Sequence, residues 1–541
     1  MEARTAVGCV VGYGHIAETF ASNIANSVRS TLKYASGRNP SRIEAFAKKF
    51  HCEAVVLSDF ETKVLADKDV DFVVVCTPTY THFDLVSAAL KAGKHVFCEK
   101  PLTVGADRVR ELGDLANAAN LVLMAGFQRR MDEDFCALKD TVSSDEVGDV
   151  EIIRITSRDG YGETKETELV VYEALIHDFD MCHFLTGQEP DIVQAFQPTR
   201  ESLVVFLKYS SGILVTINWA KDVSYLYDQR VEVFGSKGTA MLNNVPQAHV
   251  IKCKNREEQH LPYHDYYTRR YVNAYRAELN HFLDAMKGVC TNSLLGIEQS
   301  ICSAKIADRV LASLASSARD ATVVPTVQPC DLQYPYTALA DSSHHTAQLQ
   351  SRKKLRMCLV GANGRMGHIR FECFVRHPRI EVAAVVDSTG KVHETMSDIP
   401  FFSDVDAALS AVEVDACWIC VPTPYHLGTI TKIAAHGKPM FTEKPVAVSV
   451  PDIDKCFDIA KAAGVPLLCG WQWRFDNHFK ELKRYVENGM LGLPRQIETT
   501  FGDNPPPPPE LMGHLGSMVH DMMVHQIDAC LWLPGGRPQR G

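Results

Sequence analysis

The sequence predicts an α/β fold: a doubly wound parallel sheet, a second α/β domain with an open and largely antiparallel sheet, and then a second, truncated copy of both. Short apolar runs such as Phe72–Cys76 and His95–Cys98 alternate with amphipathic helical patterns such as Leu85–Ala92, which is typical of βαβ units. From about residue 147 the pattern changes to alternating strands such as Val150–Ser157. These indicate an antiparallel sheet with one solvated face.

Three motifs recur along the chain with one spacing. Glu99-Lys100-Pro101 returns as Glu443-Lys444-Pro445, an offset of 344 residues (443 − 99). The same offset relates Cys76–His82 to Cys420–His426 and Gly126–Asp132 to Gly470–Asp476. Three matches in register indicate a tandem duplication. The predicted domains are a dinucleotide-binding domain at 1–124, a substrate domain at 125–325, a linker at 326–354, a second dinucleotide-binding domain at 355–469 and a truncated substrate domain at 470–541.

Composition excludes several classes of partner. The formal net charge is −10, from 56 Lys and Arg against 66 Asp and Glu, so the chain lacks the basic surface that nucleic acid or an anionic membrane requires. The 17 cysteines are scattered, and several lie in apolar runs, which indicates reduced thiols rather than a disulfide framework. No apolar run approaches the roughly 18 residues of a membrane helix. We therefore predict a cytoplasmic protein without bound metal.

A glycine-rich turn follows the first strand of each copy. Such a turn lets the backbone approach a pyrophosphate, whose charge then lies at a helix N-terminus. In the second copy the spacing is one residue longer. The residues predicted to bind the dinucleotide there are Gly12, Gly14, His15 and Ile16 in the first copy and Gly361, Gly364 and Gly367 in the second.

The residues at the end of the second strand differ between the two copies, and the difference predicts a different cofactor for each. Asp387 ends this strand in the second copy, where a carboxylate accepts hydrogen bonds from the ribose of NAD. The first copy has Gly37 and Arg38 instead, which favours the 2′-phosphate of NADP. The sequence thus predicts NADP in copy 1 and NAD in copy 2; a merely solvated Arg38 is the alternative.

Two further elements carry chemistry. Lys100 and Lys444 follow apolar strands, so each ammonium reaches the crevice at the carboxyl edge of its sheet. On a helix, Glu173 lies one turn before His177, where a carboxylate can orient the ring and raise its basicity, as a general base requires. The second copy has Asp521 and His525 in the same pattern.

These residues, taken in order, resemble the glucose–fructose oxidoreductase and inositol 2-dehydrogenase family, and most of all its inositol dehydrogenases. The resemblance implies Rossmann domains and NAD(P)-dependent oxidation of a secondary alcohol of a cyclic polyol or sugar. It implies a catalytic set of Lys100, Glu173 and His177, repeated as Lys444, Asp521 and His525. It implies substrate contacts at Arg129, Asp180 and Asp528, and a nicotinamide site lined by Thr77, Pro78, His82 and Glu99 and by Pro422, His426 and Glu443.

Two departures from the family pattern matter. The family has Asp where this chain has Glu173, and the second copy keeps that Asp but lacks the substrate sheet. We therefore expect the first copy to hold the working site, because an unwalled site leaves its chemistry open to water. The outer face of the residue 147–240 sheet predicts a homo-oligomer. The alternatives are an NADP-linked dihydrodiol or other carbonyl oxidoreductase, NAD-assisted glycoside cleavage, or a non-catalytic dinucleotide sensor.

Overall fold

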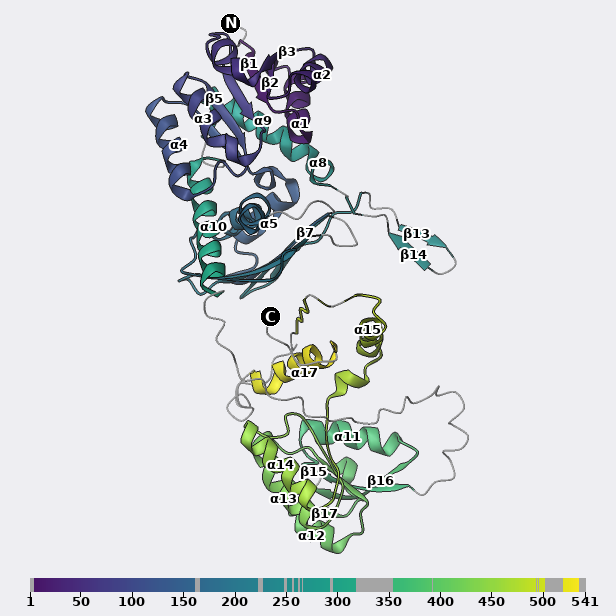
Figure 1. The fold of residues 1–541 in the computed structure, drawn as a ribbon. Coiled ribbons are helices and arrows are strands. Elements are labelled where there is room, and N and C mark those ends of the chain that lie inside the picture. The colour runs from purple at the N-terminus through teal and green to yellow at the C-terminus, as the bar shows by residue number, and fades with distance from the viewer. Residues whose placement is uncertain are drawn as a thin grey trace. The chain divides into compact units, whose positions relative to one another are not determined.

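The computed structural model describes residues 4–160, 166–221, 227–247, 251–254, 257–260, 263–264, 266–291, 295–317, 354–391, 393–492, 494, 496–501 and 519–534 (Figure 1). Contacts divide the chain into two units, Met1–Val327 and Gln328–Gly541. This division falls within the segment predicted as a linker, most of which lies outside the described residues. The domain boundaries inside each unit stay predictions.

The first unit begins with a parallel sheet of six strands in the order β3-β2-β1-β4-β5-β6, which is the doubly wound Rossmann order. Its central strands are continuous apolar runs because helices cover both faces. The strands are β1 (Ala6–Val11), β2 (Ser30–Gly37), β3 (Glu53–Val56), β4 (Phe72–Val75), β5 (His95–Glu99) and β6 (Leu123–Gly126). The helices between them are α1 (His15–Ala25), α2 (Pro40–Phe50), α3 (His82–Lys91) and α4 (Ala106–Ala118).

An open sheet follows in the order β12-β11-β7-β10-β9-β8. Its inner face packs on helices, and its outer face is exposed. The pairing is antiparallel except between β7 and β10, so the sheet is mixed, and the predicted largely antiparallel arrangement is confirmed. The strands are β7 (Val150–Asp159), β8 (Ile192–Thr199), β9 (Ser202–Lys208), β10 (Leu214–Lys221), β11 (Asp228–Gly235) and β12 (Thr239–Leu242), with a separate hairpin of β13 (Ile251–Lys254) and β14 (Glu257–His260).

The chain then returns to the parallel sheet. The Phe282 ring on α9 (Val272–Met286) packs edge-on against Phe72 of β4 and Phe97 of β5, with centroids 5.7 and 5.8 Å away. The two sheets of the first unit therefore share one hydrophobic core, which fixes their facing edges. The helices of this part are α5 (Glu133–Ser143), α6 (Thr167–Val170), α7 (Ile176–Thr186), α8 (Tyr267–Arg270), α9 (Val272–Met286) and α10 (Ile297–Ser317).

The second unit repeats the parallel sheet in the order β17-β16-β15-β18-β19-β20. Its strands are β15 (Leu355–Val360), β16 (Ile380–Val386), β17 (Phe401–Phe402), β18 (Ala416–Ile419), β19 (Met440–Thr442) and β20 (Leu467–Cys469). Its helices are α11 (Arg365–Arg376), α12 (Val405–Ala411), α13 (His426–Ala435), α14 (Val450–Ala462), α15 (Asn477–Glu487) and α17 (Val524–Trp532).

After Gly470 none of the described residues of the second unit lies in a strand. The sequence pattern of Arg495–Phe501 predicts a strand, but none of its described residues, 496–501, lies in one, so this prediction is wrong. The proline run Pro505–Pro509 lies outside the described residues. Across the described part of the chain, no helix has the length and apolarity needed to cross a membrane.

Candidate active site

A cleft of about 800 Å³ opens in the first unit where the carboxyl ends of β1, β4 and β5 face the open sheet. Parallel strands end at one edge, so side chains far apart in sequence meet there. Most of the predicted site residues of the first copy line this cleft: Gly14, His15, Ile16, Thr77, Pro78, His82, Glu99, Lys100, Arg129, Glu173 and His177. Gly12, Arg38 and Asp180 do not.

Gly12 lies beneath the cleft and shapes it. Its φ is +129°, and a Cβ built on it would lie 2.6 Å from the Cys76 carbonyl oxygen at the end of β4. Only glycine fits this turn without strain. The turn leads into the N-terminus of α1, which Gly14 caps without a side chain. The backbone there fits a dinucleotide pyrophosphate.

Lys100 and Glu173 meet across the cleft. The Lys100 Nζ donates to the Glu173 backbone carbonyl at 2.5 Å, and the Thr79 hydroxyl donates to Glu173 Oε1 at 3.1 Å. The Glu173 carboxylate is thus held beside the 76–82 turn. This differs from the predicted arrangement, in which it orients His177.

The reason is a π-helical turn over Val171–Leu175 between α6 and α7. A π turn inserts an extra residue and shifts the angular positions that a regular helix would give. Among the described residues His177 Nδ1 therefore has no hydrogen-bond partner. Burial, followed by the positive charges of Lys100 and Arg129, lowers the pKa of His177 well below its ordinary value of 6.5. The predicted rise in basicity is wrong, and the ring is neutral at neutral pH.

Two more predicted residues have clear environments. Burial raises the pKa of Glu99 to about 7, although Lys100 opposes the shift. The His82 ring spans two backbone carbonyls, with Nδ1 2.8 Å from Pro101 O and Nε2 2.7 Å from Thr77 O. It ties the loop after β4 to the Glu-Lys-Pro segment and so holds Lys100 in position.

Arg129 lies at the base of the cleft in a buried network. Its guanidinium donates to Asp178 Oδ1 and to Gln229 Oε1, both at 2.6 Å. The Ser157 hydroxyl donates to the same carboxylate and amide at 2.7 to 2.8 Å. The network joins β7, β11 and α7 beneath the substrate side.

Asp180 is not at the cleft, which corrects the predicted substrate contact. Its carboxylate is fully buried and accepts from Arg130 Nε at 2.8 and 3.0 Å. The second unit repeats the pair as Arg474 and Asp528, at 2.5 and 2.9 Å. Both aspartates thus hold the turn after the last parallel strand against the histidine-bearing helix.

The sequence prediction missed much of the substrate side of the cleft. Asp159 and Lys221 are the last residues of β7 and β10, so the end-of-strand rule applied to Lys100 could have found them. The Trp219 Nε1 donates to Asp159 Oδ2 at 3.0 Å. No local signal marks Tyr266 and Tyr267, which line the cleft after a long return of the chain; their rings are tilted by 37°, with centroids 4.1 Å apart.

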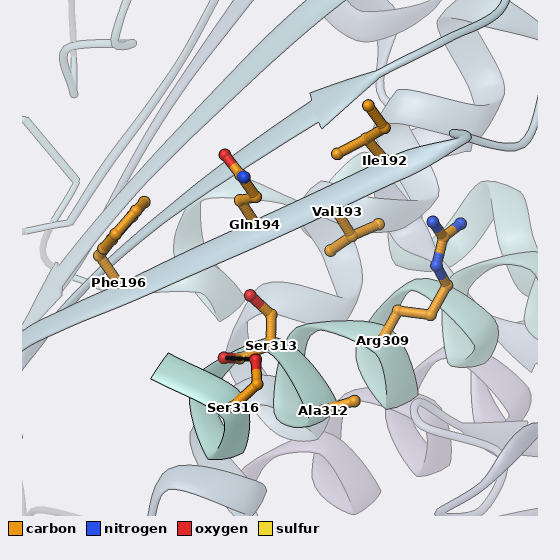
Figure 2. Close-up of a pocket in the computed structure, with 8 residues that line it drawn as sticks. All are labelled: Ile192, Val193, Gln194, Phe196, Arg309, Ala312, Ser313 and Ser316. Carbon is orange, nitrogen blue, oxygen red and sulfur yellow. Dashed lines mark hydrogen bonds between the residues drawn. The ribbon is translucent and has the colours of Figure 1, made fainter. Parts of the chain in front are cut away.

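A second hollow of about 490 Å³ lies between β8 and α10 and contains no predicted site residue (Figure 2). Its polar groups hold α10 to the edge strand. The Ser313 hydroxyl accepts from the Ala195 backbone N–H at 3.0 Å, and Arg309 donates to the carbonyls of Pro190 and Asp191. The helix thereby covers the sheet edge.

The second unit keeps the scaffold of the site. Gly361 and Gly364 form the turn into α11, Asp387 directly follows β16, and Pro422 precedes the turn to α13. His426 repeats the clamp, with Nδ1 2.9 Å from Pro445 O and Nε2 2.8 Å from Val421 O.

The remaining predicted residues of the second unit are only partly brought together. Glu443 is paired with Arg370, and His525 is hydrogen-bonded to Gln472. Gly367 packs against the turn carbonyl of Gly361. The backbone of Asp521 lies in a π-helical turn at Val519–Met523, and its side chain lies outside the described part. Lys444 follows β19, as predicted.

Comparison with known proteins agrees with this architecture. The family described as "Oxidoreductase family, NAD-binding Rossmann fold" matches residues 8–127 and again 355–470. The "GFO/IDH/MocA C-terminal domain" matches residues 135–241 and 479–540. The chain belongs to the GFO/IDH/MocA family. The predicted family and fold class are confirmed.

Similar proteins in this family are dehydrogenases. Inositol 2-dehydrogenase of Rhizobium meliloti (strain 1021) is 33% identical over 293 residues, which are 51% of this chain and 88% of that protein. A crystal structure of a myo-inositol dehydrogenase from Corynebacterium glutamicum is 28% identical with a TM-score of 0.52, covering 58% of this chain and 98% of that one. The scyllo-inositol dehydrogenase of Lactobacillus casei, at 22% identity and TM-score 0.55, covers 58% and 98% and shares the fold.

Replacing Asp180 by Asn tests its structural assignment. We expect the change to destabilise the first unit by about 3–5 kcal/mol, because it leaves the buried Arg130 charge unpaired. Urea unfolding followed by circular dichroism measures the loss. Asp107→Asn, in an exposed pair with Arg110, is the matched control and should leave the midpoint unchanged. A stable Asp180→Asn protein with a raised KM would instead restore Asp180 as a substrate contact.

Proposed function

We propose that the first unit is an NAD(P)-dependent dehydrogenase that oxidises a secondary alcohol of a cyclic polyol or sugar to a ketone. One observation carries this proposal: a neutral buried His177 and the Lys100 ammonium line one cleft with the glycine-rich turn. The identity to inositol dehydrogenases supports the substrate class.

His177 and Lys100 have separate roles in the proposed oxidation of the alcohol. The nicotinamide of a bound dinucleotide supplies the hydride acceptor. The neutral His177 imidazole accepts the hydroxyl proton as the carbon–hydrogen bond is lost, so that alcohol becomes ketone. The Lys100 ammonium donates a hydrogen bond to the same oxygen and stabilises its developing negative charge. Lys100 also disfavours protonation of His177 before substrate arrives.

The substrate side suits a ligand with several hydroxyl groups. Asp159 offers carboxylate acceptors, while Lys221 and Gln229 offer donors. The Trp219 indole, whose N–H is already bonded to Asp159, adds an apolar wall. Alternating polar groups and a flat apolar surface are what a ring with hydroxyls on its edge requires.

Turnover tests the proposal. Purified protein mixed with myo-inositol and NAD or NADP should produce reduced nicotinamide, measured by absorbance. His177→Asn should lower kcat by about 10²–10⁴-fold, the usual worth of a general base. His183→Asn, on the same helix, is the matched control.

Other outcomes would move the chemistry elsewhere. A signal that survives His177→Asn and disappears in His525→Asn would assign turnover to the second unit. Cofactor binding without turnover on myo-inositol and a panel of sugars would favour a dihydrodiol or other carbonyl substrate, or a sensor.

We further propose that the first unit prefers NADP. Gly37 ends β2 beside Gly12, whose N–H donates to Ser36 O at 2.8 Å, so Arg38 follows directly at the adenosine side. A Cβ on Gly37 would lie 2.7 Å from the Tyr13 ring, which leaves no room for a ribose-binding acid. The Arg42 guanidinium lies 4.4 Å from the same ring. Two cations and no carboxylate favour a 2′-phosphate.

A single substitution tests this preference. Arg38→Ser, which installs the residue type of Ser388 in the second copy, should raise the KM for NADP about 10–100-fold and leave that for NAD unchanged. The reason is the loss of a charge-assisted bond of about 1.5–3 kcal/mol. Arg110→Ser on α4 is the control. A wild-type enzyme that already prefers NAD would contradict the proposal.

The outer face of the open sheet supports a homo-oligomer. Phe196, Phe206 and Leu214 are each about half exposed on three adjacent strands, and the two phenylalanine rings lie 6.1 Å apart. Because α10 covers the β8 edge, the sheet can associate through its face.

Sedimentation velocity tests the homo-oligomer. Phe206→Lys should shift a wild-type dimer to monomer, because it places a charge in an apolar interface. Val28→Lys, at an exposed loop position, should leave the sedimentation coefficient unchanged. A wild-type protein that sediments as a monomer at tens of micromolar would contradict the proposal.

A further inference from the structure

We infer that the second unit binds NAD(H) without transferring hydride, so that the chain carries a non-catalytic dinucleotide site in addition to its catalytic one. This goes beyond the proposed function, which concerns the first unit. It depends on a contrast between the two halves of the second site. The half that would hold adenosine and pyrophosphate is retained, and the half that would carry out chemistry is occupied by the protein's own side chains.

The dinucleotide half is intact. Gly361 has a φ of +84°, and a Cβ there would lie 2.6 Å from the Val421 backbone nitrogen, so the turn passes as closely to the next strand as it does in the first unit. Gly364 then caps the N-terminus of the twelve-residue helix α11 without a side chain. This bare backbone is a cradle that any larger residue would fill.

A carboxylate stands at the ribose position. Asp387 Oδ2 accepts from the Asn363 backbone N–H at 2.9 Å, and Oδ1 accepts from Thr389 N–H and hydroxyl at 3.1 and 2.8 Å. Among the described contacts Oδ2 has one donor, so it retains a lone pair for a ribose hydroxyl. A 2′-phosphate would be repelled there, which selects NAD(H) over NADP(H).

The base is already engaged. The Gln472 amide nitrogen lies 3.2 Å from His525 Nε2 and can donate its N–H to the ring nitrogen that would accept a substrate proton. Trp473 stacks on the same ring at 5.4 Å and 24°. Trp473 stands at the position of Arg129 (473 − 344), so an indole replaces a cation at the floor of the cleft.

The acid after the fifth strand is also engaged. Glu443 Oε1 accepts from Arg370 Nε at 2.6 Å and from the Trp418 indole N–H at 3.1 Å. Arg370 is the sixth residue of α11, and the sixth residue of α1 is Phe20. Glu443 is therefore an ion-paired carboxylate, unlike Glu99, whose pKa is raised to about 7.

These substitutions act together. The Arg370 guanidinium lies over the Trp418 ring at 5.1 Å, and Phe441 stacks on the same ring at 3.7 Å. In the first unit this face is covered by α9, where Tyr275 contacts Phe20. In the second unit the side chains of Arg370, Trp418 and Phe441 cover the corresponding face of the sheet. A dinucleotide bound there meets neither an available base nor a strand-walled substrate pocket in the described residues.

Binding stoichiometry tests the inference in the full chain. We use the His177→Asn variant, in which turnover by the first unit is expected to be lowered by about 10²–10⁴-fold, and titrate NADH by calorimetry and by energy transfer from tryptophan. Trp418, Trp471, Trp473 and Trp532 lie in the second unit, whereas Trp219 lies in the cleft of the first, so the part of the signal that Asp387→Ala removes is the part assigned to the second unit. We expect one NADH site that Asp387→Ala weakens at least tenfold and that saturating NADPH does not displace. Asp398→Ala, a nearby exposed acid, is the matched control and should leave binding unchanged.

Each alternative result has a distinct meaning. NADH binding that ignores Asp387→Ala, or that NADPH displaces, would overturn the second site without bearing on polyol oxidation by the first. If the Asp387→Ala protein unfolds, the NADPH competition still tests the inference, because it does not require that substitution. Formation of NADH from NAD and substrate in His177→Asn, abolished by His525→Asn, would show that the second unit transfers hydride and would also overturn it.

Discussion

The close approach of the first turn to the neighbouring strand controls the architecture of both units. Gly12 passes so near the Cys76 carbonyl that no side chain can stand between them, and Gly361 repeats this contact beside Val421. That approach lets a helix begin at the carboxyl edge of the sheet with its amides pointing outward. The other side chains of the site take their positions from this edge, because parallel strands all end there.

The two units show which contacts belong to the scaffold and which to the chemistry. The histidine clamp between the loop and the Glu-Lys-Pro segment is kept in both, as is the arginine–aspartate pair that holds the helix bearing His177 or His525. Side chains facing the reacting centre differ: Trp473 replaces Arg129, and Arg370 approaches Glu443. The second copy has thus kept the contacts that hold the loops and helices in place, whereas its side chains near the site are engaged with one another.

Much of the fold and roughly half of the cleft could be predicted from the sequence. Periodicity, the matched motifs and the strand-end rule predict the sheets and place Lys100 and His177 in one crevice. Helical spacing failed at Glu173, because a π turn changes the angle between i and i+4 without any marker in the sequence. The family resemblance misplaced Asp180, because its pairing with the buried Arg130 is a tertiary contact that no local pattern marks. Tyr266 reaches the cleft only through the long return of the chain, which no local pattern encodes.

The Tyr13 ring has an evolutionary consequence. Because a Cβ at position 37 would lie 2.7 Å from that ring, an acid there requires the tyrosine to move or to be replaced. A change of preference from NADP to NAD by this route therefore requires two linked changes, and the one at position 13 has to come first. Under the two proposals made above, NADP in the first unit and NAD(H) in the second, the duplicated chain binds each dinucleotide in a separate unit.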